Sequence, residues 1–133
     1  MPLENVELTR RFYDAFNRRD LDASLAVIDP EVEFAARFME VEGDPYYRGH
    51  DGIREWWRTL LAIFPDFSAE VLDVRETGGF LILALRIRGH GAGSGVPVDE
   101  AVWQAVEVRD GKVTWARNFG SEAEALEAAG QRK

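Results

Sequence analysis

The sequence contains no cysteine and only two histidines. Without cysteine the chain has no disulfide bond, no thiolate metal ligand and no cysteine nucleophile. The histidines, His50 and His90, lie in different predicted loops, and neither shares a helix face with a carboxylate at metal-ligand spacing. We therefore predict no metal site, and nothing in the sequence indicates a cofactor.

Long apolar runs and excess positive charge are also lacking. The longest apolar run, residues 80–85, is too short to cross a bilayer, and residues 1–5 lack the basic and apolar regions of a signal peptide. Lysine and arginine total 16 against 24 aspartates and glutamates, which gives a net charge of −8. Because such a chain repels nucleic-acid phosphates and anionic lipids, we predict a cytoplasmic protein without nucleic-acid or membrane partners.

What is present is the composition of an ordinary globular domain. The 133 residues are 46% hydrophobic and 30% charged. At this length roughly two-thirds of the surface of the unfolded chain can be buried, so a hydrophobic core is available. We find no repeat and no linker, and we predict one domain over residues 1–133.

The spacing of apolar residues predicts three helices in the first half of the chain. The first covers residues 3–18. The second follows Asp20 as its N-cap and ends before Pro30, because a proline disfavours helical geometry in the residue before it. The third begins at Asp51 after a loop over residues 46–52, and Pro65 ends it.

Alternating apolar residues predict the strands. An early strand contains Val32, Phe34 and Ala36, and four more cover residues 67–76, 79–90, 97–109 and 112–119. Asp110-Gly111 is a strong signal for a type I′ hairpin turn. A short last helix has a Ser121–Glu124 capping box and Gly130 as its predicted end. This order predicts an α+β fold with helices packed on one face of an antiparallel sheet.

Three segments in this order carry a resemblance to a known family. They are Tyr47-Arg48-Gly49-His50-Asp51-Gly52-Ile53-Arg54-Glu55-Trp56-Trp57, Gly93-Ser94-Gly95-Val96-Pro97-Val98 and Arg109-Asp110-Gly111-Lys112-Val113. The chain resembles the SnoaL-like branch of the nuclear-transport-factor-2-like superfamily. The resemblance implies a cone-shaped, curved antiparallel sheet with helices on its concave face, enclosing a pocket for a small, often apolar molecule. The superfamily includes polyketide cyclases, isomerases, epoxide hydrolases and binding proteins, so the fold alone does not specify a reaction.

The resemblance also implies where catalytic groups would stand. The isomerase-like tyrosine and its two acids fall on Phe12, Phe34 and Gln104. The epoxide-hydrolase arginine and two aspartates fall at about Leu85, Ile87 and Asn118. The cyclase-like histidine and aspartate fall on Gln104 and Asn118. Because amides donate and accept hydrogen bonds but do not exchange protons near neutral pH, the familiar acid–base pair is absent.

Two interpretations of the amides Gln104 and Asn118 stay open. They orient a carbonyl or hydroxyl of a ligand in an apolar cavity, or they satisfy each other and nearby backbone groups. Glu100 and Tyr13 are the weak candidates for proton transfer, Glu100 because alternation places it on the same sheet face as Gln104. A solvated carboxylate for Glu100 and a packing role for Tyr13 are the simpler interpretations.

The predicted ligand-binding walls are apolar. Besides Gln104 and Asn118 they comprise Phe12, Phe16, Phe34, Trp57, Leu83, Leu85, Val102 and Val106. The simplest interpretation of the adjacent Trp56 and Trp57 is that both are core residues; the alternative is that one of them forms a pocket wall, since both cannot point the same way. Alternation leaves Ile82, Trp103 and Trp115 on the outer face of the sheet, and such an apolar surface predicts a homodimer through that face.

We therefore predict a protein that binds a small apolar or amphipathic molecule. The alternatives are a cyclase-like or isomerase-like enzyme acting on a ring-containing substrate, and a structural dimerisation module without a ligand. Whether the protein is an enzyme is left open by the sequence.

Overall fold

The helices and strands follow the predicted order with one additional strand. The computed structural model describes residues 2–35 and 46–132. The elements are α1 (Pro2–Asn17), α2 (Leu21–Leu25), β1 (Ile28–Ala35), β2 (Tyr46–Arg48), α3 (Gly49–Ile63), β3 (Ser68–Thr77), β4 (Phe80–His90), β5 (Pro97–Arg109), β6 (Lys112–Phe119) and α4 (Glu122–Arg132). The predicted α+β class is confirmed. Ala36, predicted within the first strand, lies outside the described residues.

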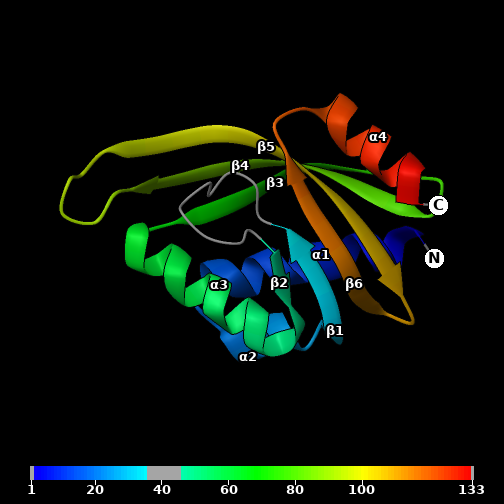
Figure 1. Cartoon of the computed structure of the whole chain (residues 1–133), viewed down its shortest axis with the longest axis horizontal. Coiled ribbons are helices and arrows are strands. Elements are labelled where there is room, and N and C mark those ends of the chain that lie inside the picture. Colours follow the sequence, from blue (N-terminus) through cyan, green and yellow to red (C-terminus); the bar gives the residue numbers. More distant parts are fainter. Residues whose placement is uncertain (1, 36–45, 133) are drawn as a thin grey trace.

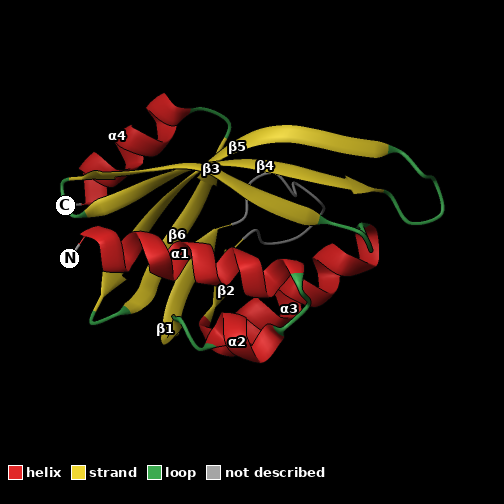
Figure 2. Cartoon of the chain, turned by 180° about the vertical axis from the view of Figure 1, so that it is seen from behind, coloured by secondary structure: helices red, strands yellow, loops and turns green. Residues whose placement is uncertain are grey.

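The strands form one curved sheet in the order β2-β1-β6-β5-β4-β3. Helices α1, α2 and α3 lie on its concave face, and α4 lies on the opposite face (Figures 1 and 2). Neighbouring strands are antiparallel except β1 and β6, which run parallel with Phe34 opposite Ala116. Strand patterns specify faces but not partners, so the sequence did not predict this parallel pair or the place of α4.

Side-chain hydrogen bonds attach α1 to β3 across the concave face. The Nδ2 of Asn17 donates to the Ala69 carbonyl at 2.8 Å, and its Oδ1 accepts from the Ala69 N–H at 3.0 Å. Arg19, which ends the turn after α1 with φ 63°, donates to the Phe67 carbonyl at 2.7 Å. The aromatic face of α1 is thereby held against the sheet.

The second helix is shorter than predicted. Asp20 caps it as expected, with its Oδ1 accepting from the Ala23 N–H at 3.1 Å, but the helix ends at Leu25. The chain is already extended at Ile28, which pairs with Val113 of β6, so Pro30 lies inside β1. The prediction of a helix reaching to Pro30 was wrong because pairing with β6 overrides the local pattern.

Residues 46–52, predicted as a loop, form β2 and the first turn of α3. Gly49 has φ 71°, and a Cβ there would lie 3.1 Å from the Pro30 carbonyl oxygen, so this sharp turn requires glycine. The ring Nε2 of His50 lies 2.8 Å from the Ile28 carbonyl and ties the turn to β1. The end of α3 before Pro65 is confirmed, since the helix stops at Ile63.

The last part of the chain follows the predictions closely. Asp110 and Gly111 have φ of 52° and 74°, which confirms the type I′ turn between β5 and β6. Ser121 Oγ accepts from the Glu124 N–H at 3.2 Å, which confirms the cap of α4. Gly130 does not end this helix, because α4 continues to Arg132 while Ala125 and Ala129 pack against the sheet.

Two hydrophobic clusters form on the two faces of the sheet. The inner cluster lies between the concave face and the first three helices, and it includes Phe16, Trp57 and Leu83. The outer cluster lies under α4 and consists of Phe80, Ile82, Ala105, Phe119, Ala125 and Ala129. Ile82 is 3% exposed, so the expectation that it contacts a second copy was wrong. Within the described residues, no helix is long and apolar enough to cross a membrane.

Candidate functional site

A cavity of about 40 Å³ lies between the concave face of the sheet, α1 and α3. The described residues that line it are Thr9, Phe12, Tyr13, Ile28, Val32, Phe34, Ile53, Trp56, Gln104, Val106, Val113 and Ala116. Since one water needs roughly 10–15 Å³ of such space, the cavity has room for about three water molecules. It accommodates the tip of a ligand, and a whole ring enters only if lining side chains move.

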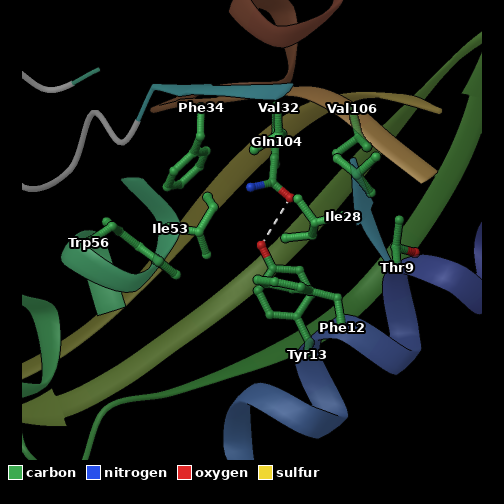
Figure 3. A pocket seen from close by; sticks show the side chains of 12 residues that line it. Thr9, Phe12, Tyr13, Ile28, Val32, Phe34, Ile53, Trp56, Gln104 and Val106 are labelled. Atoms are coloured by element: carbon green, nitrogen blue, oxygen red, sulfur yellow. Dashed lines mark hydrogen bonds between the residues drawn. The ribbon is translucent and has the colours of Figure 1, made fainter. Parts of the chain in front are cut away.

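A chain of three neutral hydrogen-bonding side chains, Tyr13, Gln104 and Asn118, reaches the wall of this cavity. The Tyr13 hydroxyl donates to Gln104 Oε1 at 2.9 Å (Figure 3), and Gln104 Nε2 donates to Asn118 Oδ1 at 2.8 Å. Gln104 and Asn118 are directly opposite on β5 and β6, which places their side chains within reach. All three residues are buried. We call them the amide chain.

The position of Tyr13 corrects the expectation that this tyrosine has only a packing role. The resemblance placed the isomerase-like tyrosine on Phe12, but the next residue along α1 brings a phenol to Gln104. Burial raises the pKa of Tyr13, and the hydrogen bond to Gln104 offsets only part of that effect. Tyr13 therefore stays protonated at neutral pH with its proton directed to Gln104, so it is neither a base nor a free donor in this arrangement.

The predicted site residues separate into two groups. Phe12, Phe34, Gln104 and Val106 line the cavity together with Tyr13, and Asn118 joins them through Gln104. Four more predicted wall residues are buried in the inner cluster without reaching the cavity; they are Phe16, Leu83, Leu85 and Val102.

Trp57 does not stand where the sequence prediction placed it, and Glu100 follows the simpler of its two interpretations. Trp56 lines the cavity, whereas Trp57 packs against Phe16 at 4.7 Å between ring centroids. Glu100 lies opposite Ile87 on the sheet face that alternation predicts, and its side chain is exposed and does not line the cavity, as expected for a solvated carboxylate. The helical stripe contained both tryptophans, and only the packing of α3 decides between them.

Several lining residues were missed by the sequence analysis as members of the site. Ile28 and Val32 come from β1, Ile53 from α3, and Val113 and Ala116 from β6. The alternation of the early strand marked Val32 as buried, and the apolar stripe of α3 marked Ile53. Nothing in those patterns distinguishes a cavity wall from a filled core, because both are apolar.

The electrostatics of the site are neutral. Its lining within the described residues contains no lysine, arginine, aspartate, glutamate or histidine. The polar groups are Thr9, whose hydroxyl donates to the Val6 carbonyl at 2.7 Å, and Tyr13 and Gln104. Over the described ranges no group of three or more histidines and carboxylates lies close enough to hold a metal ion. The arrangement is suited to binding a neutral molecule through shape and hydrogen bonds.

One polar atom near the cavity has no partner. Trp56 is 7% exposed, and its indole Nε1 is the single buried side-chain nitrogen or oxygen of the described residues without a hydrogen bond. Buried polar groups are nearly always paired, so this donor needs an explanation.

The sheet, the three concave-face helices and the neutral cavity define an α+β cone with an internal cavity. The sequence profile of the SnoaL-like domain matches residues 9–116. The chain therefore belongs to the SnoaL-like family, and the resemblance deduced from its motifs is confirmed. No curated protein matches the chain in a sequence search.

Solved structures share this fold at low sequence identity. An NTF2-like protein of unknown function from Burkholderia pseudomallei superposes with a TM-score of 0.79 at 21% identity, covering 93% of this chain and 95% of that one. TerC, co-crystallised with polyporic acid, has a TM-score of 0.78 at 20% identity, covering 93% and 96%. A hypothetical protein with a ketosteroid isomerase-like fold from Catenulispora acidiphila, in complex with trimethylamine, has a TM-score of 0.75 at 14% identity, covering 93% and 92%. These similarities establish the fold and leave the ligand of this chain open.

Proposed function

We propose that this protein binds a small neutral molecule, apolar or amphipathic, in the cavity between α1, α3 and the concave face of the sheet. The observation that carries the proposal is the amide chain at the wall of an otherwise apolar cavity. Its unused capacity, a lone pair of Tyr13 and the second hydrogen of Gln104 Nε2, allows a ligand hydroxyl or carbonyl to bind without displacing the chain.

The neutral lining favours binding over acid–base chemistry. An unpaired carboxylate or phosphate buried there would lose its hydration without gaining a cation. Proton transfer near neutral pH needs a group that titrates in that range, and Tyr13 is shifted away from it. A cyclase-like or isomerase-like reaction remains the second candidate, and it would depend on shape and hydrogen bonding rather than on Glu100.

Ligand titrations followed by NMR test the proposal. Cyclopentanone is expected to shift the side-chain amide signals of Gln104 and Asn118, whereas cyclopentanecarboxylate is expected to leave them unchanged. Ala116→Val, which adds two carbons to the cavity wall, should abolish the shifts. Ala101→Val, on the exposed outer face of β5, is the matched control and should bind as the wild type does.

Other results would contradict this function. Tighter binding of the carboxylate than of the ketone would overturn the neutral-ligand proposal. Absence of any shift with either compound would favour the third candidate, a structural module in which the amide chain only stabilises the core.

We also propose a homodimer through the outer sheet face, and this proposal now rests on Trp103. Ile82 is covered by α4, but Trp103 and Trp115 stay half-buried beside the outer cluster. Trp103→Glu should convert a dimer to a monomer by placing a charge in an apolar contact. A wild type that sediments as a monomer at tens of micromolar, a rough working range, would exclude this dimer.

We also expect the protein in the cytoplasm.

A further inference from the structure

The indole of Trp56 is a buried donor without an acceptor. Its Nε1 has no hydrogen-bond partner among the residues that the structure describes, and Trp56 is only 7% exposed and lines the cavity. Figure 3 shows Trp56 on α3 together with Ile53, and the Tyr13–Gln104 hydrogen bond on the same cavity. No contact among residues 2–35 and 46–132 therefore accounts for a polar atom at this position.

Aromatic neighbours restrict the Trp56 ring. Its centroid lies 5.5 Å from that of Phe16 and 5.0 Å from that of Phe34, and the Phe34 ring meets it edge-on at 82°. Turning the indole to find an acceptor elsewhere would disrupt both contacts. The N–H is thus held in place before anything binds, which lowers the entropy lost when a partner arrives.

The chemistry of the lining defines that partner. An indole N–H only donates, so the missing group is an acceptor. The described lining has no cation to stabilise an anionic acceptor, and the Thr9 hydroxyl is already bonded to the Val6 carbonyl. This environment therefore favours a neutral oxygen as the acceptor, because no charge has to be desolvated.

We propose that Trp56 is a ligand-binding residue whose Nε1–H donates to the oxygen of a neutral carbonyl compound in the cavity. This inference rests on the proposed binding function and adds the class of ligand to it. The carbonyl oxygen lies at Trp56, and the apolar remainder of the ligand contacts the phenylalanines and aliphatic walls. The amide chain keeps its internal hydrogen bonds, and the second hydrogen of Gln104 Nε2 stays available to a further oxygen of the ligand.

The test compares cyclopentanone with methylenecyclopentane, which has nearly the same shape but no acceptor oxygen. Affinities are measured by NMR titration of wild type, Trp56→Phe and Trp57→Phe. Trp57 is the matched control, because it is an adjacent buried tryptophan that contacts Phe16 but does not line the cavity. Melting temperatures of all three proteins identify any variant that fails to fold.

The wild type is expected to prefer the ketone by roughly two- to tenfold, the range for one neutral hydrogen bond. Trp56→Phe should lose this preference, and Trp57→Phe should keep it. The indole N–H signal of Trp56, assigned in the wild type, should also move with cyclopentanone and stay in place with methylenecyclopentane. This signal reports on Trp56 even if the variant does not fold.

Two contrary results are distinguishable. If both compounds bind equally well, or if the ketone preference survives in Trp56→Phe, the cavity binds ligands but Trp56 is not the donor, and this inference is overturned alone. If neither compound shifts any cavity signal, the proposed function fails together with it.

Discussion

The two faces of the sheet bury polar side chains in opposite ways. On the concave face the amide chain is neutral and lies beside a cavity. On the outer face Glu107 is 8% exposed and accepts hydrogen bonds from Thr114 Oγ1 at 2.8 Å and Arg132 Nη2 at 3.4 Å, with Arg109 Nη2 3.3 Å away. Arg132 also lies over the Trp115 ring at 4.7 Å and so joins the end of α4 to the sheet.

This difference indicates that the two polar networks are suited to different roles, one to binding a ligand and the other to attaching α4 to the sheet. A charged group holds α4 against the sheet because its partners are supplied by the chain itself, so no outside molecule is needed to neutralise it. The neutral amide chain beside the cavity can bind an uncharged ligand without the cost of desolvating an ion. The outer face is therefore suited to stability, and the concave face to a ligand.

The largest loss of stability is expected from a substitution at the centre of the inner cluster. Phe16 is fully buried and contacts Trp56, Trp57 and Phe67. Phe16→Ala should lower the free energy of unfolding by about 3–5 kcal/mol through lost burial and a new cavity. Urea denaturation measures this loss. A loss below about 1 kcal/mol, smaller than that range allows, would show that the concave face is loosely packed rather than closed around the cavity.

Glu107→Gln tests the charged network of the outer face. Burial by itself would raise the pKa of Glu107, but the hydrogen bonds from Thr114 and Arg132 and the nearby positive charges lower it below the ordinary value. The substitution should cost roughly 1.5–3 kcal/mol at neutral pH, as for hydrogen bonds to a charged group.

The pH dependence of that loss has a definite sign. A depressed pKa stabilises the folded protein above the glutamate pKa of the unfolded chain, and the stabilisation disappears as the pH falls through the folded-state pKa. The difference in unfolding free energy between wild type and Glu107→Gln should therefore be full at pH 7 and shrink in acid. An unfolding free-energy difference that is the same at pH 7 and in acid would contradict the role of the Glu107 charge.

Asn118→Leu tests the neutral network in the same way. Removing Asn118 Oδ1 leaves Gln104 Nε2 without this acceptor, which should lower stability by about 1–2 kcal/mol. Because neither amide titrates and burial raises the pKa of Tyr13, the loss should be equal at pH 5 and pH 8. Denaturation at both pH values, with a cyclopentanone titration on the same sample, measures stability and binding together. Unchanged stability with weakened binding would mean that Asn118 contacts the ligand rather than the protein.

The smallest loss of stability is expected from a substitution in the exposed pair of Asp66 and His90. His90 donates its backbone N–H to Asp66 Oδ1 at 2.7 Å, and its ring Nδ1 lies 2.7 Å from Asp66 Oδ2. These hydrogen bonds lower the pKa of Asp66, so their contribution is present at neutral pH and lost in acid. Asp66→Asn should lower the melting temperature less than Glu107→Gln does, since the pair is exposed and screened. A larger drop would mean that this turn supports the fold more than either buried network.

The strands and caps were predictable because their signals are local. Asp110-Gly111 specifies a turn through its own backbone preferences, and Asp20 and Ser121 cap helices through bonds only three residues long. The family was recognisable for the same reason, since its motifs are turn and cap signals in a fixed order. The resemblance implied that Gln104 and Asn118 face each other on neighbouring strands, and the structure shows them bonded to each other.

The sequence by itself determined which face of each strand the apolar residues occupy, because apolar periodicity follows from strand geometry. Only the tertiary structure decided that β1 runs parallel to β6, that α4 covers Ile82, and that Trp56 rather than Trp57 lines the cavity. Each of these depends on contacts between elements distant in sequence, and the same local pattern fits either outcome. Tyr13 meets Gln104 across 91 positions, a separation over which no periodicity carries information.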